Sequence, residues 1–273
     1  MKILQVTSPT EFIVLDVARP EPGPGQVLMR IMAVTTCPQW DLHLRHGEPM
    51  FAGHEFNYPY APGQPGHEAA GVVEAVGDGV TDLAPGDHVC AWRDPGHDRP
   101  GCYAQYVVHS AKNVIRVSED IPFESLAPLE LAMCVGTVFR MLRNMDAIGG
   151  RRVGVTGLGP AGLIAVQMAR AEGATQVFGF DPVAARREVG CRVGADACFD
   201  PAGDLNAEFP LRPTSRLECS IDCVGAKRSV QFLMDRTEDV VALFGVQRED
   251  YVYGLRHSSL RLCAWGGFIP SAV

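Results

Sequence analysis

Three glycines have the spacing of a turn that holds the phosphates of a dinucleotide. Gly157, Gly159 and Gly162 follow the apolar run 153–156 and begin a helix-like segment. In such a turn the first glycine permits the tight bend, the second lets the backbone approach a pyrophosphate, and the third lets the helix pack on the strand. The helix N-terminus then presents free N–H groups to the anion. The pattern predicts a dinucleotide site, and a glycine turn without a ligand is the alternative.

An acidic residue after the next apolar run indicates which dinucleotide binds. Asp181 closes the run 176–180, and its carboxylate can accept hydrogen bonds from the adenosine ribose and repel a 2′-phosphate. The sequence therefore favours NAD over NADP. Arg186 and Arg187 keep NADP open, with Arg186 expected along the adenosine face, unless both arginines belong to a solvated helix surface.

A second group of candidate residues is built on histidine and glutamate. Gly-His-Glu occurs at residues 53–55 and 66–68, and only the second triplet continues with Gly71, Gly77 and Val80. Residues 66–80 match the pattern G-H-E-x2-G-x5-G-x2-V, and the chain thereby resembles the zinc-dependent medium-chain alcohol and polyol dehydrogenase superfamily. The resemblance covers essentially the whole chain, because the glycine turn stands where that family places it.

The resemblance implies one catalytic zinc ion. Cys37 matches the family's early cysteine, His67 the histidine of the triplet, and Glu130 the later ligand. Glu68 matches a glutamate that binds the metal directly or stands close behind it. Thiolate, imidazole and carboxylate suit a tetrahedral zinc with one open position, where an alcohol is activated for hydride release. In isolation, Cys37 would be interpreted as a small buried residue and Glu130 as a surface charge.

The segment after Cys37 departs from the family pattern. Relatives have a serine or threonine two residues after this cysteine and an aspartate directly after that, whereas here no hydroxyl stands at that position and Asp41 comes one residue late. Asp41 is expected to orient His67. His43 matches the histidine that passes the alcohol proton to solvent, with a surface histidine as the alternative.

A structural zinc is not expected. Many relatives have four closely spaced cysteines in the region that here runs from Cys90 to Cys102, and this chain has only those two. A closed four-thiolate zinc site needs four cysteines. The residues between them, Asp94, His97 and Asp98, are interpreted as part of a solvated loop.

Three further residues are candidates for cofactor contacts. Relatives place a residue near the nicotinamide at the position of Thr137, although a helix hydroxyl often bonds its own backbone. Val224 and Val246 stand near the ends of two predicted strands. Ligands bind at strand carboxyl ends in open α/β sheets, so both valines are expected to pack on the adenine or nicotinamide ring.

The elements that must position these residues follow two patterns. Short β-rich runs at 26–34, 70–76, 88–92 and 104–108 alternate with Pro-Gly turns and predict a barrel or sandwich. Residues 123–145 have a helical period and predict one or two helices. Strands at 153–156, 176–180, 197–199, 217–222, 240–246 and 260–265 alternate with helix-like segments such as 161–171 and 183–193. The expected fold is α/β, with a GroES-like β-barrel catalytic domain (1–125) and a Rossmann doubly wound parallel-sheet domain (126–273).

Composition narrows the class and the location. The 273-residue chain is 47% hydrophobic, which is typical of a soluble globular protein. Its net charge of −8 is unfavourable for binding nucleic acid or an anionic membrane. The 9 irregularly spaced cysteines and an N-terminus without a signal-like pattern predict a cytoplasmic location. The family implies a homodimer or homotetramer.

We therefore predict an oxidoreductase that uses zinc to transfer a hydride between an alcohol or polyol and NAD. One alternative is a zinc-free reductase of the quinone-reductase type, which the presence of Cys37, His67, Glu68 and Glu130 disfavours. The other is an inactive, truncated NAD-binding remnant, because family members continue for several tens of residues after the run at 260–266.

Overall fold

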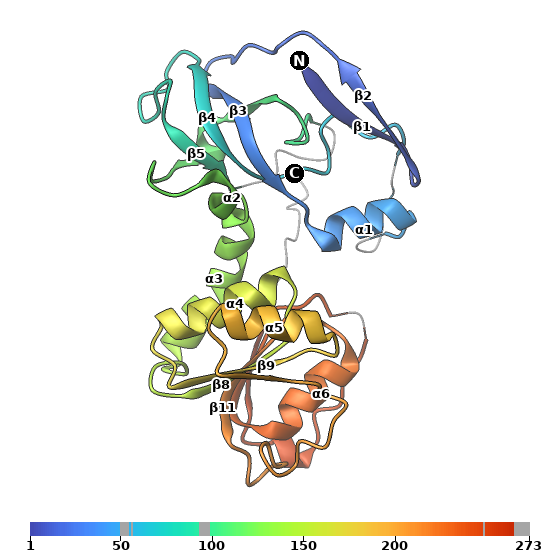
Figure 1. Cartoon of the computed structure of the whole chain (residues 1–273), viewed down its shortest axis with the longest axis vertical. Helices are drawn as coiled ribbons and strands as arrows, with labels where there is room; N and C mark the ends of the chain where they lie inside the picture. The colour runs from blue at the N-terminus through green and yellow to red at the C-terminus, as the bar shows by residue number, and fades with distance from the viewer. Residues whose placement is uncertain (50–54, 56, 93–98, 248, 265–273) are drawn as a thin grey trace. The chain divides into compact units, whose positions relative to one another are not determined.

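The chain forms two compact units, Met1–Met133 and Cys134–Val273, shown in Figure 1 as the blue-to-green and the green-to-red parts of the ribbon. This computed structural model describes residues 1–49, 55, 57–92, 99–247 and 249–264. The boundary between the units falls inside helix α3 (Leu129–Asn144). Sequence patterns had suggested a boundary at residue 125.

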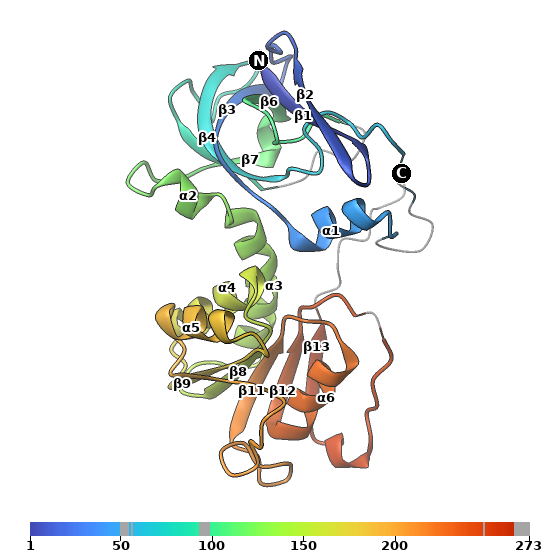
Figure 2. The ribbon, with the colours of Figure 1, turned by 45° about the vertical axis from the view of Figure 1, so that its right-hand side comes forward.

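The amino-terminal unit is built on a five-stranded antiparallel sheet of order β6-β3-β4-β5-β7. Its strands are β3 (Gln26–Thr35), β4 (Glu68–Val76), β5 (His88–Ala91), β6 (Tyr106–Ser110) and β7 (Val114–Arg116). Figure 2 shows these strands curling round one another as in a barrel. Val27, Met29, Val73, Val89 and Val107 share the buried core inside the curl. The expected strands of this unit are confirmed, with bounds shifted by a few residues.

Besides β7, two elements of this unit were not anticipated. One is the hairpin of β1 (Lys2–Ser8) and β2 (Glu11–Asp16), whose Phe12, Ile13 and Val14 are exposed and so lack an in-out alternation. The other is helix α1 (Pro38–His46), which begins directly after Cys37 and ends at Gly47 in the left-handed conformation, φ 66°. Proline at the start and glycine after the end are the usual helix boundary signals.

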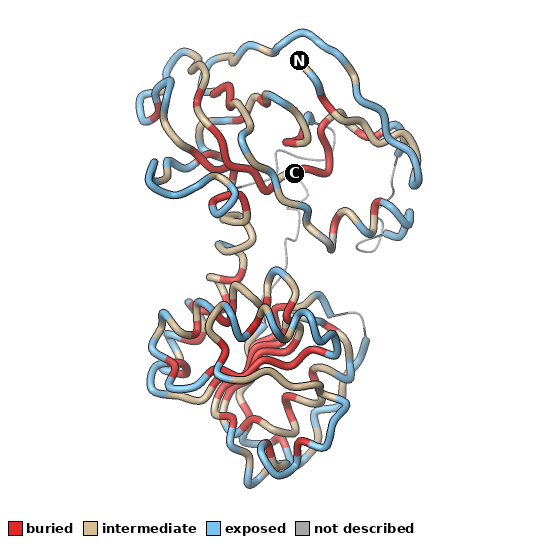
Figure 3. The backbone as a smooth tube through the Cα atoms, viewed as in Figure 1, coloured by how far each residue is buried: buried red, intermediate tan, exposed pale blue. Residues whose placement is uncertain are grey.

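The carboxyl-terminal unit is a six-stranded parallel sheet of order β10-β9-β8-β11-β12-β13. Its strands are β8 (Arg152–Thr156), β9 (Gln176–Phe180), β10 (Ala197–Phe199), β11 (Leu217–Asp222), β12 (Thr237–Leu243) and β13 (Arg261–Ala264). Helices α4 (Pro160–Ala171), α5 (Ala184–Arg192) and α6 (Lys227–Arg236) cover it. Figure 3 shows its strands as a buried layer. From β8 the chain adds β9 and β10 on one side of the sheet, and then β11, β12 and β13 on the other side. The strand order thus reverses between β8 and β11, and doubly wound folds bind dinucleotides at such a point.

The prediction of one or two helices over residues 123–145 is confirmed, whereas one predicted strand needs new bounds. Residues 123–145 form α2 (Phe123–Leu126) and α3, separated by Pro128, which lacks the N–H needed to continue a helix. The stretch Phe123–Asn144 is long and apolar enough to cross a membrane by length and composition alone. Its second half, however, packs Val135, Val138, Phe139 and Leu142 into the protein core. Strand β12 starts and ends three residues earlier than the predicted run 240–246, which leaves Val246 beyond its end.

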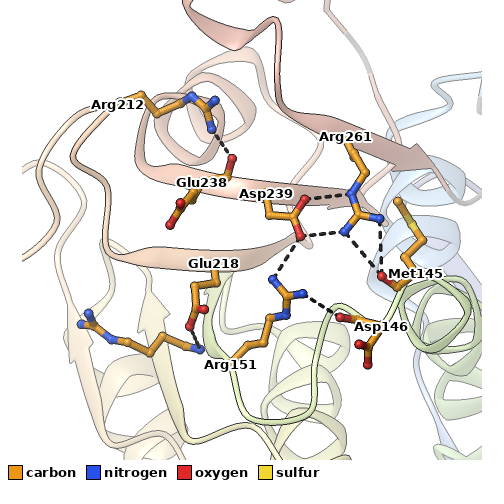
Figure 4. A network of polar contacts seen from close by, with 9 residues as sticks. Met145, Asp146, Arg151, Arg212, Glu218, Glu238, Asp239 and Arg261 are labelled. Carbon is orange, nitrogen blue, oxygen red and sulfur yellow. Dashed lines mark hydrogen bonds and ion pairs between the residues drawn. The ribbon is translucent and has the colours of Figure 1, made fainter.

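A charged cluster joins β12, β13 and the segment before β8 (Figure 4). The Asp239 carboxylate accepts hydrogen bonds from Arg261 at 2.6 and 2.8 Å and from Arg151 at 3.0 Å. Arg151 also donates to the Asp146 carbonyl, and Arg261 to the Met145 carbonyl. The hydrogen bond from Arg261, with the positive charges of both arginines, holds the pKa of Asp239 below its usual value.

Candidate metal centre and cofactor turn

The glycine turn has the shape that a pyrophosphate requires. Gly157 directly follows β8 with φ 80°, a conformation that favours glycine. A Cβ on Gly162 would lie 1.8 Å from the Gly157 carbonyl oxygen, so only glycine fits this first turn of α4. A Cβ on Gly159, the N-cap of α4, would meet nothing within 4 Å. The N-terminus of α4 thus has room for an anion beside its free N–H groups.

Asp181 is tied to this turn. It is buried, with 1% of its surface exposed. Its Oδ2 accepts a hydrogen bond from the Leu158 amide at 2.9 Å, and its Oδ1 accepts one from the Val183 amide at 2.8 Å. Arg186 is largely exposed, with Nη1 3.7 Å from Asp181 Oδ2. Arg187 instead turns back to donate to the carbonyls of Asp181 and Pro182.

The two candidate valines lie at one edge of the sheet with the glycine turn. Val224 follows β11 and packs against Gly157. A Cβ on Gly157 would lie 2.5 Å from Val224 Cγ2. Val246 follows β12, and its carbonyl oxygen would lie 2.0 Å from a Cβ on Gly225. Both side chains are exposed at 45% and 39%. Thr137, on α3, donates its hydroxyl to the Cys134 carbonyl at 2.7 Å, which is the backbone bond open to any helical threonine.

In the amino-terminal unit, Cys37, His67 and Glu68 come together. One ligand atom from each lies within 4.8 Å of the others. Antiparallel pairing of β3 and β4 places Thr35 opposite Glu68, which brings Cys37, just after β3, beside the start of β4. The end of β3 and the start of β4 therefore bring together a cysteine, a histidine and a glutamate, whose side chains are typical zinc ligands.

His67 is oriented for metal binding through Nε2. Its Nδ1 donates to the Pro65 carbonyl at 2.8 Å, and its Nε2 lies 3.9 Å from Glu68 Oε1. Burial favours the neutral ring, but the hydrogen bond and negative charge of Cys37 outweigh it and raise the pKa of His67 to about 10. The charge of Glu130 contributes in the same direction, so Glu130 lies near the site, although not within the mutual cluster of three.

Glu68 shows directly that the cluster suits a cation. Its side chain is 2% exposed, and Oε2 accepts a hydrogen bond from the Thr35 hydroxyl at 2.7 Å. The other oxygen, Oε1, is buried and accepts no hydrogen bond from the described residues, although His67 Nε2 lies 3.9 Å away. Buried carboxylate oxygens normally accept a hydrogen bond, so this position beside Cys37 and His67 fits a metal ion.

Asp41 and His43 lie on α1, next to this cluster. Asp41 Oδ1 accepts a hydrogen bond from the Tyr103 hydroxyl at 2.9 Å. Burial raises the pKa of Asp41, against the opposing effects of Tyr103, the charge of His67 and the amide of Cys37. Asp41 was expected to orient His67, and in this structure the hydrogen bond at His67 Nδ1 goes to Pro65 instead. His43 Nδ1 lies 3.0 Å from the Glu48 carbonyl oxygen.

The two cysteines of the expected loop belong to separate parts of the core. Cys90 is buried with Ala70, Leu126 and Ala127. Cys102 is buried with the core of the curled sheet, where its Sγ lies 3.5 Å from His109 Nε2. Asp94, His97 and Asp98 lie outside the described residues.

Sequence reasoning missed three groups that position the candidate ligands: the Thr35 hydroxyl, the Pro65 carbonyl and Tyr103. Thr35 and Pro65 stand two residues from Cys37 and His67 respectively, so nearness along the chain was the one available signal. Tyr103 had none, because its partner Asp41 is distant in the sequence.

Both units match known families. The pattern of the alcohol dehydrogenase GroES-like domain matches residues 23–119, and that of the zinc-binding dehydrogenases matches residues 160–255. L-threonine 3-dehydrogenase of Thermococcus kodakarensis is 31% identical over 85% of this chain and 71% of its own length. Alcohol dehydrogenase of Geobacillus stearothermophilus is 32% identical over 72% of this chain and 62% of its own length. The chain thus spans about two thirds of these relatives.

Solved structures support the same assignment. A protein from Sinorhizobium meliloti 1021, described as a zinc-binding dehydrogenase bound to NADP, has a TM-score of 0.80 and is 25% identical. The match covers 96% of this chain and 83% of that one. With the expected fold present in each unit and both halves matched in sequence, the chain belongs to the zinc-dependent medium-chain alcohol dehydrogenase family of oxidoreductases.

Proposed function

We propose that this protein oxidises an alcohol or polyol to the corresponding carbonyl compound with NAD, using one catalytic zinc ion. The observation that carries the proposal is the cluster of Cys37, His67 and Glu68, whose ligand atoms lie within 4.8 Å of one another around a buried oxygen without a hydrogen bond. The net reaction moves a hydride from the alcohol carbon to the nicotinamide and releases the hydroxyl proton.

The chain's own residues have distinct roles in this proposal. Cys37, His67 and Glu68 hold the zinc, with Glu130 as a further candidate ligand. When bound, zinc supplies Lewis acidity that lowers the pKa of a substrate hydroxyl. The Pro65 carbonyl fixes the tautomer of His67 that leaves Nε2 available. His43 carries the released proton toward solvent at Nε2, because Nδ1 donates to the Glu48 carbonyl.

The cofactor proposal rests on Asp181. Its buried carboxylate beside the glycine turn favours a ribose with free hydroxyls and opposes a 2′-phosphate. Gly157, Gly159 and Gly162 bind the pyrophosphate, while Val224, Val246 and Thr137 are proposed contacts of the rings. Arg187 is held by backbone carbonyls, so Arg186 is the arginine available to the adenosine.

We also propose a cytoplasmic homodimer or homotetramer without a structural zinc. The nine cysteines form no disulfide with one another, which suits a reducing compartment. Cys90 and Cys102 are buried in different core clusters, so these two thiols are not arranged as a pair of ligands.

Metal content and turnover together test the proposal. Protein purified without chelator is analysed by elemental mass spectrometry, and NADH formation is followed with primary alcohols, secondary alcohols, polyols and L-threonine. We expect about one zinc per chain, lost in Cys37→Ala and His67→Ala, and NADH formation with at least one substrate class. Folded protein that binds NADH but holds no zinc contradicts the mechanism. Zinc and NADH binding without turnover of any substrate contradicts the activity.

A further inference from the structure

Tyr103 contacts both segments that carry the candidate metal ligands. We infer that it is a positioning residue, which braces the Cys37 segment against the His67 segment so that the ligands are arranged before the metal binds. The inference rests on the proposed zinc site. Tyr103 does not itself belong to the cluster of ligands, since its hydroxyl donates to Asp41.

The hydroxyl end of Tyr103 holds the Cys37 segment. Its oxygen lies 2.9 Å from Asp41 Oδ1. Asp41 lies one helical turn from Cys37: its amide donates to the Cys37 carbonyl at 2.8 Å, and the Cys37 amide faces its carboxylate. The other carboxylate oxygen, Oδ2, is buried and has no hydrogen-bond partner among the described residues. Loss of the Tyr103 hydroxyl would therefore leave Asp41 poorly satisfied, and the start of α1 would be free to shift.

The ring and backbone of Tyr103 hold the His67 segment. A Cβ on Gly66 would lie 2.9 Å from ring atoms Cγ and Cδ1 of Tyr103, so the ring packs directly on the residue before His67. The Tyr103 amide donates to the Gly63 carbonyl at 3.0 Å, and the Cys102 amide donates to the Gly66 carbonyl at 2.7 Å. These contacts fix the turn whose Pro65 carbonyl orients His67.

Tyr103 thus connects the segment of Cys37, just after β3, with the segment of His67, just before β4. Groups behind metal ligands act by fixing ligand orientation, and their loss typically weakens metal affinity by about 10- to 100-fold. A purely structural tyrosine would instead affect the stability of the metal-free protein and leave the affinity for zinc unchanged.

The test is Tyr103→Phe in the full chain, with Tyr106→Phe as the matched control. Tyr106 loses the same hydroxyl from the same unit, where its ring lies under Arg19 rather than beside the cluster. Zinc affinity is measured by competition with a chromophoric chelator, cobalt coordination by visible absorption, and stability by urea unfolding of the metal-free protein. We expect Tyr103→Phe to weaken zinc binding at least about tenfold and to alter the cobalt spectrum, with Tyr106→Phe unchanged.

Asp41→Ala, which removes the acceptor of the Tyr103 hydroxyl, completes a double-mutant cycle and serves if Tyr103→Phe does not fold. Because Tyr103 acts through Asp41, the two changes together should weaken zinc binding little more than either alone. Independent, additive losses would overturn the inference, as would wild-type zinc affinity in Tyr103→Phe or in Asp41→Ala. Absence of zinc binding by the wild-type protein is a different result, which defeats the proposed function itself.

Discussion

The amide of Leu158, inside the glycine turn, donates a 2.9 Å hydrogen bond to the buried carboxylate of Asp181. The group proposed to select NAD therefore also fixes the turn that holds its phosphates. Cofactor preference and the shape of the turn depend on the same side chain.

Asp181→Asn should weaken NADH binding about tenfold, because a neutral amide accepts hydrogen bonds from the ribose less well than a carboxylate. The variant should also narrow the difference in affinity between NADH and NADPH, because it loses the negative charge that opposes a 2′-phosphate. Binding is measured by fluorescence titration with each nucleotide. The matched control is Asp200→Asn, since Asp200 follows β10 as Asp181 follows β9 and is more exposed, at 43%. Unchanged NADH affinity in Asp181→Asn would contradict the role assigned to this carboxylate.

Gly162→Ala should destabilise the carboxyl-terminal unit and weaken NADH binding. The added methyl group would lie 1.8 Å from the Gly157 carbonyl oxygen, so the N-terminus of α4 must move. We expect a loss of about 1–3 kcal/mol in the free energy of unfolding, measured with urea. Gly136→Ala is the control, because a Cβ there meets nothing within 4 Å inside α3 and should be neutral or slightly stabilising. Equal behaviour of the two variants would argue against a tight turn.

Zinc affinity should rise with pH through the neutral range. Without metal the pKa of His67 is about 10, because the interaction with Cys37 outweighs the effect of burial. Zinc needs the Nε2 lone pair and must displace this proton, which costs progressively less as the pH approaches the pKa. We expect about a tenfold gain in apparent affinity per pH unit from this proton alone, measured by chelator competition between about pH 6 and about pH 8. A flat profile would contradict the coupling of Cys37 to His67.

Asp239→Asn should destabilise the protein at neutral pH by about 2 kcal/mol, the usual worth of a hydrogen bond to a charged group. The folded pKa of Asp239 lies below the ordinary 3.8. Its ion pairs therefore stabilise the fold above that value and lose their effect as the pH falls through the lower folded pKa. The difference in free energy of unfolding between variant and wild type should shrink from pH 7 toward pH 3. Asp235→Asn alters a separate carboxylate, paired with Arg256 and His257, and shows whether the effect is specific to this cluster.

The parallel sheet was predictable because its strands carry local signals. The predicted runs 176–180, 197–199 and 217–222 coincide with β9, β10 and β11. β9 and β10 are almost entirely apolar, as strands covered on both faces usually are, whereas β11 also contains Glu218, Ser220 and Asp222. The glycine turn and Asp181 were found for the same reason, because each follows a strand directly in the sequence.

The support around the metal cluster was not predictable, because it depends on pairings between distant segments. Nothing in the sequence shows that Thr35 faces Glu68 or that Tyr103 reaches Asp41. The resemblance identified Cys37, His67 and Glu68, but the pairing of β3 with β4 was needed to show which atoms meet. The start of α1 after Cys37 was signalled only by Pro38, and its end by Gly47.

The register of β3 against β4 also decides whether the candidate metal ligands can meet. Cys37 and Glu68 meet only once Thr35 has found its place opposite Glu68, and a slip of one residue would turn Glu68 to the other face of the sheet. The three candidate ligands of the proposed zinc site can therefore act together only in this register. A slipped strand pair would lose the site while keeping every ligand residue in the chain.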